Sequence, residues 1–190
     1  MDSFQGDKAA IKEGLKRAQG FGVLNKSSGV QYFCTTVDMP NDTFGCLTRV
    51  MEGVNKDKKA SEWGKILLSL SSDETRILGV AHLPEKLATS AKLTVREWID
   101  GVAAALDIPS GSEGQLFTHD ESTLLDDTFY GFVIRTDLMD PDREIFAFKL
   151  CDEFKQKNID FLKAKGLIPV AGNNREDDVE DYSEAAGIVW

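Results

Sequence analysis

The sequence predicts an α/β domain, a small mixed β-sheet packed with helices, extended by a long C-terminal helix and an acidic tail. Runs of strand length, rich in β-branched and apolar residues, recur along the chain. Segments with apolar residues at helical spacing lie between and after these runs. Apolar residues make up 42% and charged residues 28% of the 190 residues, as in ordinary folded domains.

The chain divides into four parts. Residues 1–29 are predicted to be an N-terminal helix and linker, and residues 30–136 the α/β domain. Residues 137–170 should hold a long C-terminal helix. Residues 171–190, called the acidic tail below, are mostly acidic and polar and finish in Trp190, a composition that predicts disorder when the tail is alone.

The N-terminal part predicts a short helix over residues 7–19, because apolar residues recur there at helical spacing. Gly20 and Gly22 are expected to stop it. Its basic residues form either a solvated helix face or a binding face for an acidic partner. These residues are Lys8, Lys12, Lys16 and Arg17.

The α/β part begins with a strand over residues 30–37. A helix follows to Val54, capped by Asp42 or Thr43. The next strands occupy residues 65–71 and 76–82 and are joined by a hairpin turn. Their near-continuous apolar runs are typical of strands that are covered on both faces.

The second half of this part alternates helices and loops. Residues 84–91 predict a helical turn, and Thr94 with Glu97 forms a capping box for a helix that continues to Leu106. A loop over residues 107–114 and an unassigned polar segment come next. Residues 129–136 predict a fourth strand.

Asp140 and Pro141 predict the start of the C-terminal helix, and Gly166 its end. We expect this helix to be the longest element. Its apolar stripe, which includes Phe154 and Phe161, either covers the sheet or serves as a docking face. In the acidic tail, Ile188 and Trp190 are expected to anchor in a groove, either on this domain or on a partner.

Charge and cysteine content narrow the function classes. The net charge of −10 disfavours nucleic-acid binding by bulk charge. The three cysteines include no CxxC pair, which is typical of free thiols in a reducing compartment. The first residues resemble neither a secretory signal nor a transit peptide, and no run reaches the roughly 20 apolar residues of a membrane span. We therefore expect a cytoplasmic protein with no membrane contact.

Residues with catalytic potential are few. Residues 111–114 lack the Lys-Ser/Thr of a phosphate-binding loop. His82 follows an apolar strand, so a structural role is favoured over a general base. His119, with Asp120 and Glu121, could hold an ion or belong to an unrecognised enzyme. The favoured expectation is no catalytic set, no metal site and no cofactor.

One family resemblance covers a little under half of the chain. The paired strands over residues 65–85 and the helix start over residues 92–102 are similar to the C-terminal globular domain of alanyl-tRNA synthetase, which is related to the domain that follows the DHH phosphoesterases. The resemblance extends over roughly residues 32–114. It implies contact with the outer corner of tRNA and a role in dimerisation, and neither aminoacylation nor editing.

The glycine-rich loop of that family is altered in this sequence. Of its glycines, the resemblance carries over only Gly111 and Gly114, because Glu113 interrupts the run and no Arg-Pro-Asp follows. The first hypothesis is therefore a non-catalytic protein-interaction or structural subunit, within a large assembly or as a homodimer. Its predicted partner-binding residues are Phe154, Phe161, Ile188 and Trp190.

The alternative is a tRNA- or RNA-binding accessory factor. It requires one local basic face on an otherwise acidic chain. The residues predicted to form this face or to contact RNA beside it are Lys12, Lys16, Arg17, Lys86, Lys92, Arg96, Gly111 and Gly114.

Overall fold

The computed structural model describes residues 3–38, 43–106, 117–120, 127–136 and 147–168. Helices are interspersed with strands along the chain, as in an α/β protein. The elements are α1 (Ser3–Ser28), β1 (Tyr32–Thr36), α2 (Phe44–Asn55), the short 3-10 helix η1 (Ala60–Glu62), β2 (Gly64–Leu70), β3 (Arg76–His82), α3 (Glu85–Ala91), α4 (Val95–Ala104), β4 (Phe117–Asp120), β5 (Phe129–Arg135) and α5 (Ala147–Ala164).

The strands form one mixed sheet in the order β1-β2-β3-β5-β4. β1 pairs with β2 in parallel, and the other pairs are antiparallel. This confirms the predicted fold class. β4 lies in the polar segment that the sequence left unassigned, and it is placed at the edge by its pairing with β5, for example His119 opposite Phe132.

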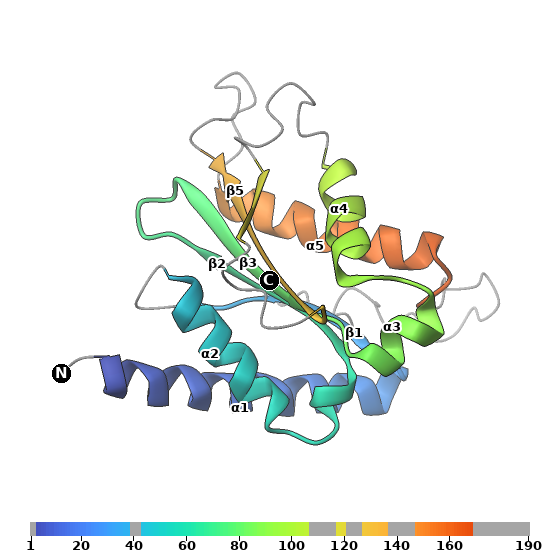
Figure 1. Ribbon diagram of the computed structural model, residues 1–190, viewed down its shortest axis with the longest axis horizontal. Coiled ribbons are helices and arrows are strands. Elements are labelled where there is room, and N and C mark those ends of the chain that lie inside the picture. Colours follow the sequence, from blue (N-terminus) through green and yellow to red (C-terminus); the bar gives the residue numbers. More distant parts are fainter. Residues whose placement is uncertain (1–2, 39–42, 107–116, 121–126, 137–146, 169–190) are drawn as a thin grey trace, which may run out of the picture.

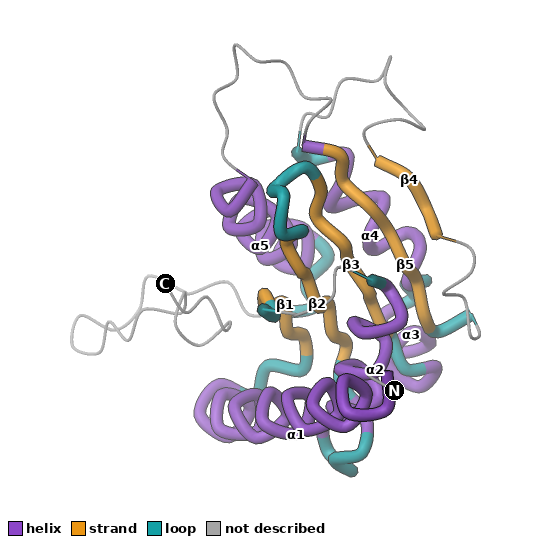
Figure 2. Tube along the Cα trace, turned by 90° about the vertical axis from the view of Figure 1, so that its left-hand side faces the viewer, coloured by secondary structure: helices purple, strands orange, loops and turns teal. Residues whose placement is uncertain are grey.

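Helices cover both faces of the sheet (Figure 1). α1 and α2 lie on one face, and α3, α4 and α5 lie on the other, as the turned view of Figure 2 also shows. Successive side chains of β2 point to opposite faces of the sheet. Ile66 and Leu68 pack in the core beneath α4 and α5, whereas Leu67 packs in the core beneath α1 and α2. The predicted burial of both strand faces is therefore confirmed.

The predicted stop of the first helix was wrong. α1 continues through Gly20 and Gly22 and ends at Ser28, just before Gly29, whose φ of +69° suits a residue without a side chain. Phe21 explains the extension, since it is buried and its ring stacks on that of Phe33 at 4.6 Å. Burial of an aromatic ring outweighs the roughly 1 kcal/mol that a glycine costs inside a helix. Among the described elements α1, with 26 residues, is the longest, and α5 is not.

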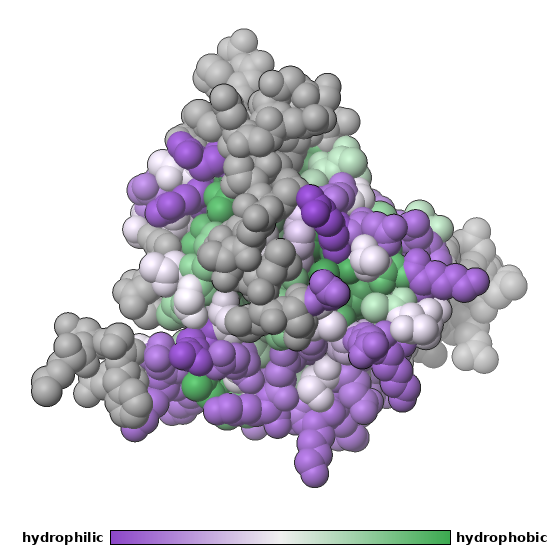
Figure 3. Space-filling view, in the orientation of Figure 1, coloured by the Kyte–Doolittle hydropathy of each residue, from purple (hydrophilic) through white to green (hydrophobic). Residues whose placement is uncertain are grey.

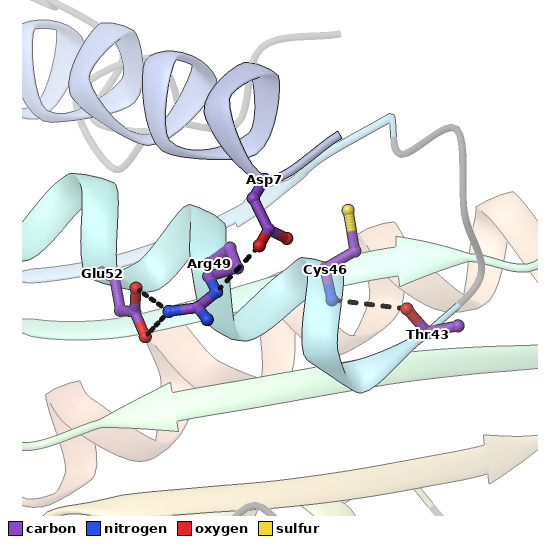
Figure 4. Close-up of polar contacts among 5 residues, drawn as sticks. All are labelled: Asp7, Thr43, Cys46, Arg49 and Glu52. Carbon is purple, nitrogen blue, oxygen red and sulfur yellow. Dashed lines mark hydrogen bonds and ion pairs between the residues drawn. The ribbon is translucent and has the colours of Figure 1, made fainter. Parts of the chain in front are cut away.

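α1 and α2 are in backbone contact through two glycines. A Cβ atom on Gly14 would lie 2.1 Å from the carbonyl oxygen of Val50, and one on Gly53 would lie 2.3 Å from that of Ile11. Any larger residue would force the helices apart. Figure 4 shows a polar link between the same helices, because Arg49 forms ion pairs with Asp7 at 3.7 Å and with Glu52 at 2.8 Å.

Both predicted helix starts in the α/β part are confirmed. Thr43 caps α2 by accepting a hydrogen bond from the N–H of Cys46, drawn in Figure 4. Thr94 and Glu97 form the full capping box of α4, with reciprocal bonds of 2.9 and 3.1 Å. Hydrogen bonds from Thr94 lower the pKa of Glu97. These local bonds fix where each helix begins.

The end of the C-terminal helix is confirmed, and its predicted start at Asp140–Pro141 lies outside the described residues. Gly166 adopts a φ of +68° just after α5. The buried side of α5 is joined to α4 by one hydrogen bond, from the indole N–H of Trp98 to Asn158 at 2.7 Å. This bond satisfies two buried polar groups, so it fixes α5 against α4 at little net cost.

Candidate functional site

The outer side of α1 forms the clearest candidate surface. Ala10, Gly14, Ala18 and Phe21 are buried against the rest of the domain, so the opposite side of the same helix faces outward. The outward residues recur at spacings of three and four, which aligns them along one stripe. We call this set the α1 stripe, and all its members are exposed: Lys12, Leu15, Lys16, Gln19, Val23 and Lys26.

The α1 stripe combines positive charge with exposed apolar side chains. Val23 is 68% exposed and Leu15 is 39% exposed. In Figure 3, hydrophilic side chains dominate the lower edge of the molecule, over α1, and a small hydrophobic area lies among them. Surfaces that mix apolar residues and cations on one helix face are suited to a partner that offers both acidic and apolar groups.

Most of the positive charge on this stripe is available for intermolecular contacts. Glu13 forms a close ion pair with Arg17 at 2.8 Å and reaches Lys16 only at 4.0 Å. Within the described part of the chain, no ion pair involves Lys12 or Lys26. Arg17 itself is half-buried beside the stripe, so its charge is largely directed to Glu13.

The residues predicted to form one basic RNA-binding face are divided between two layers. Lys12 and Lys16 belong to α1, whereas Lys86 lies in α3, Lys92 follows α3 and Arg96 lies in α4. These helices cover opposite faces of the sheet (Figure 2). The expectation of a single continuous basic face was therefore wrong, and Gly111 and Gly114 lie outside the described residues.

Arg96 has contacts of its own within the domain. Its guanidinium lies 3.7 Å from the carboxylate of Asp100 and 6.0 Å from the ring centroid of Tyr130. Burial, followed by the charge of Asp100, raises the pKa of Tyr130 to about 12. Part of the charge of Arg96 is thus directed to its own layer rather than to a ligand.

The predicted docking residues of the C-terminal helix lie against the domain. Phe154 is fully buried and stacks on Phe132 with ring centroids 5.4 Å apart, so it cannot contact a partner in this fold. Phe161 is half-buried, and its ring fills the space above Gly101. Of the two predicted roles, the stripe that contains these residues covers the sheet. Ile188 and Trp190 lie outside the described residues.

The predicted chemical candidates give no assembled site in the described part of the chain. His82 is buried and stacks on Phe129 at 4.3 Å, which accords with its predicted structural role. His119 and Asp120 belong to β4, and Glu121 lies outside the described residues. Among the residues that are described, no group of three metal-ligating side chains is present.

The described interior also holds buried cysteines and a lysine, Lys65, whose pKa values are shifted by burial. Cys34, Cys46 and Cys151 are buried, and burial raises the pKa of each thiol. Sequence analysis missed Lys65, which is fully buried and donates to the carbonyl oxygen of Ala60 at 2.5 Å. Burial lowers its pKa to about 7. A lysine at a strand start gives no sequence signal of burial, because its contact with Ala60 of η1 forms only when the chain folds.

Comparisons with known proteins leave the family undetermined. No protein-family model and no curated protein matches the chain. In the described residues, no helix has the length and apolarity that a membrane crossing requires. The resemblance to the alanyl-tRNA synthetase domain therefore stays a prediction that rests on the sequence motifs alone.

Proposed function

We propose that this chain is a non-catalytic protein-interaction or structural subunit, built on a domain like the C-terminal domain of alanyl-tRNA synthetase. The proposed binding surface is the α1 stripe, and the proposed partner is a protein segment that carries acidic and apolar residues. The observation that supports the proposal is the exposure of Leu15 and Val23 among the lysines of an otherwise acidic chain.

An acidic protein suits this surface better than RNA does. Phosphate backbones bind wide basic surfaces and gain affinity with each neutralised phosphate. The α1 stripe instead places two apolar side chains between its cations. In protein interfaces, burial of such side chains supplies much of the affinity, and surrounding charges improve the rate and specificity of association.

Affinity capture with matched charge reversals tests this proposal. The full chain, its Lys12→Glu/Lys16→Glu variant and its Lys86→Glu/Lys92→Glu variant are each used to capture proteins from the native cell, followed by quantitative mass spectrometry. All four lysines are exposed, and both variants change the net charge equally. We expect the α1 variant alone to lose partners, by about 2- to 30-fold, since each of the two exposed ion pairs contributes roughly 0.2–1 kcal/mol.

Equal capture by all three proteins would contradict the proposal, as would a loss confined to the control variant. The same proteins also separate the tRNA alternative, which is motivated by the sequence resemblance. In a gel-shift assay with total tRNA at low salt, RNA binding through the basic residues predicts a shift that both variants weaken. The interaction proposal predicts no shift at tens of micromolar protein, the range of non-specific contacts.

A further inference from the structure

The acidic tail is complementary to the α1 stripe in charge and in apolar character. Between residues 173 and 184 the sequence has six carboxylates and one arginine, and Ile188, Val189 and Trp190 follow. The α1 stripe has the opposite charge, with exposed lysines around Leu15 and Val23. Both segments therefore combine charge with apolar groups, and the signs are opposite.

We propose that the acidic tail docks in cis on the α1 stripe of the same chain. Its carboxylates lie along Lys12, Lys16 and Lys26, and its apolar residues, Ile188 and Trp190, cover Leu15 and Val23. The tail then occupies the surface that an acidic partner would bind. A partner gains access by displacing the tail, so the tail acts as a built-in competitor.

The described part of the fold permits this connection. β1 lies at the edge of the sheet and contacts both layers: Phe33 stacks on Phe21 of α1, and Thr36 lies 3.4 Å from the ammonium of Lys155 in α5. A chain that leaves α5 needs only to pass this edge to reach α1 (Figure 2).

The length of the tail is sufficient for this path. From Ile168, the last described residue, eight residues lead to Glu176 and 22 lead to Trp190. Fully extended, these segments span roughly 27 Å and roughly 75 Å. A domain of this size is roughly 40 Å across. The first carboxylates of the tail fall short of this width, whereas the carboxylates from Glu180 onward, at least 12 residues or roughly 41 Å from Ile168, and Trp190 can reach α1 on the opposite layer.

The tail of the same chain is favoured over a second copy of α1 as the occupant. Two α1 stripes placed face to face would bring their lysines together, and like charges repel. The tail offers charges of the opposite sign, and its connection to the domain gives it an effective concentration on the order of millimolar. An exposed ion pair raises a binding constant by a factor of roughly 1.4 to 5. At this effective concentration, a few such weak contacts are enough for the tail to occupy the α1 stripe.

A paramagnetic label on the full-length chain tests the docking. The label is attached to a Gln19→Cys variant, because Gln19 is exposed within the stripe and the three native thiols are buried with raised pKa values, which slows their labelling. The readout is the indole N–H signal of Trp190, assigned with a Trp190→Phe variant. Docking predicts that the label removes most of this signal.

Controls locate the contact and its cause. A label at Lys86→Cys, exposed on the opposite layer, should leave the Trp190 signal intact. The signal next to a label at position 19 should return in the Lys12→Glu/Lys16→Glu variant, and also at 1 M salt, where the screening length is about 3 Å. A Trp190 signal that is unaffected by the label at position 19, or equally affected by both labels, would overturn the proposal.

A mixed sample distinguishes one chain from two. Isotope-labelled chain without the spin label is combined with spin-labelled chain without isotope label. Docking in cis predicts no loss of the Trp190 signal in this mixture. If the signal is lost in this mixture as strongly as in the chain that carries both the isotope label and the spin label, the tail binds a second copy and the cis proposal is wrong.

The regulatory part of this inference rests on the proposed function, whereas the docking itself does not. Replacing Asp177, Asp178 and Asp181 with Asn should release the tail and raise partner capture through α1 by several fold. A Trp190 signal that responds to the label without any α1-dependent capture would leave the docking standing and remove the proposed function. If partner capture depends on α1 but the Trp190 signal does not respond to the label, the proposed function stands and the docking of the tail is wrong.

Discussion

The two helical layers of this domain are attached to one sheet by different means. On one side, α1 meets α2 through a narrow line of small residues, with Gly14 and Gly53 in backbone contact. On the other side, α4 and α5 bury large side chains, including Trp98 and Phe154, against the sheet. The first layer depends on the close approach of two backbones, and the second depends on the area of buried aromatic rings.

This difference explains why the candidate interaction surface lies on α1. A helix that packs through glycine and alanine leaves a wide part of its circumference outside the core, so a long row of residues remains exposed. In α5 the aromatic stripe is directed inward, and the buried pair Trp98 and Asn158 fixes the helix. Sequence analysis predicted docking residues on α5, whereas the packing of the helices leaves the larger exposed surface, the α1 stripe, on α1.

The largest expected effect on stability comes from the layer of α4 and α5, which buries aromatic rings against the sheet. Phe154→Ala should lower the free energy of unfolding by about 3–5 kcal/mol, because it leaves a cavity beside Phe132. Phe148→Ala is the matched control on the same helix. Phe148 is 54% exposed, so its loss should change stability by less than about 0.5 kcal/mol. Urea unfolding measures both, and equal effects would show that α5 does not depend on its aromatic stripe.

The next effect concerns the lysine buried beneath η1, on the α1 side of the sheet. Because the pKa of Lys65 falls to about 7 in the folded state, the unfolded chain binds more protons between pH 7 and 10. The contribution of Lys65 to stability therefore rises with pH, by at most about 1.4 kcal/mol per pH unit. Below about pH 7 this contribution is constant, since the lysine is then protonated in both states.

Lys65→Met should remove this rise, which urea unfolding at several pH values would detect as a difference in slope between the two proteins. The exposed Lys58→Met variant is the control and should keep the slope of the wild type. The comparison is needed because the buried thiols, whose pKa values are raised, act in the opposite direction in every variant. Parallel curves for wild type and Lys65→Met would mean that Lys65 titrates normally.

A third effect tests the backbone contact between α1 and α2. Gly14→Ala should destabilise the protein by about 1–3 kcal/mol, because its Cβ would meet the backbone of Val50 and Val54. Gly20→Ala, in the same helix, meets nothing within 4 Å. It should stabilise the protein by about 0.5–1 kcal/mol, since alanine favours the helix. Thermal unfolding of the two variants should thus shift in opposite directions.

The smallest effect compares the starts of α4 and α2. Thr94→Ala breaks a reciprocal capping box and should cost about 1 kcal/mol, whereas Thr43→Ala removes one longer hydrogen bond of 3.3 Å and should cost about 0.5 kcal/mol. Serine at either position keeps the hydroxyl and serves as the control. Chemical denaturation that ranks the two alanine variants in the reverse order would contradict this comparison.

Sequence reasoning was most accurate where the structure is decided by neighbouring residues. The two paired strands, the cap at Thr43, the box at Thr94 and the end at Gly166 follow from local hydrogen bonds and local patterns. It failed for β4, whose four polar-rich residues become a strand by pairing with β5. It also ended α1 too early, because nothing near Gly20 reveals that Phe21 will meet Phe33.

For the candidate site, too, local features could be predicted from the sequence, whereas the packing between distant segments could not. The sequence by itself determined the α/β class, the acidic charge balance, the lysines of the first helix and the acidic tail that ends in Trp190. Only the tertiary structure decided that Phe154 is buried, that the basic residues are split between two layers and that Leu15 and Val23 stay exposed. Helix periodicity tells which residues share a face, whereas the neighbours that cover a face are brought there by distant parts of the chain.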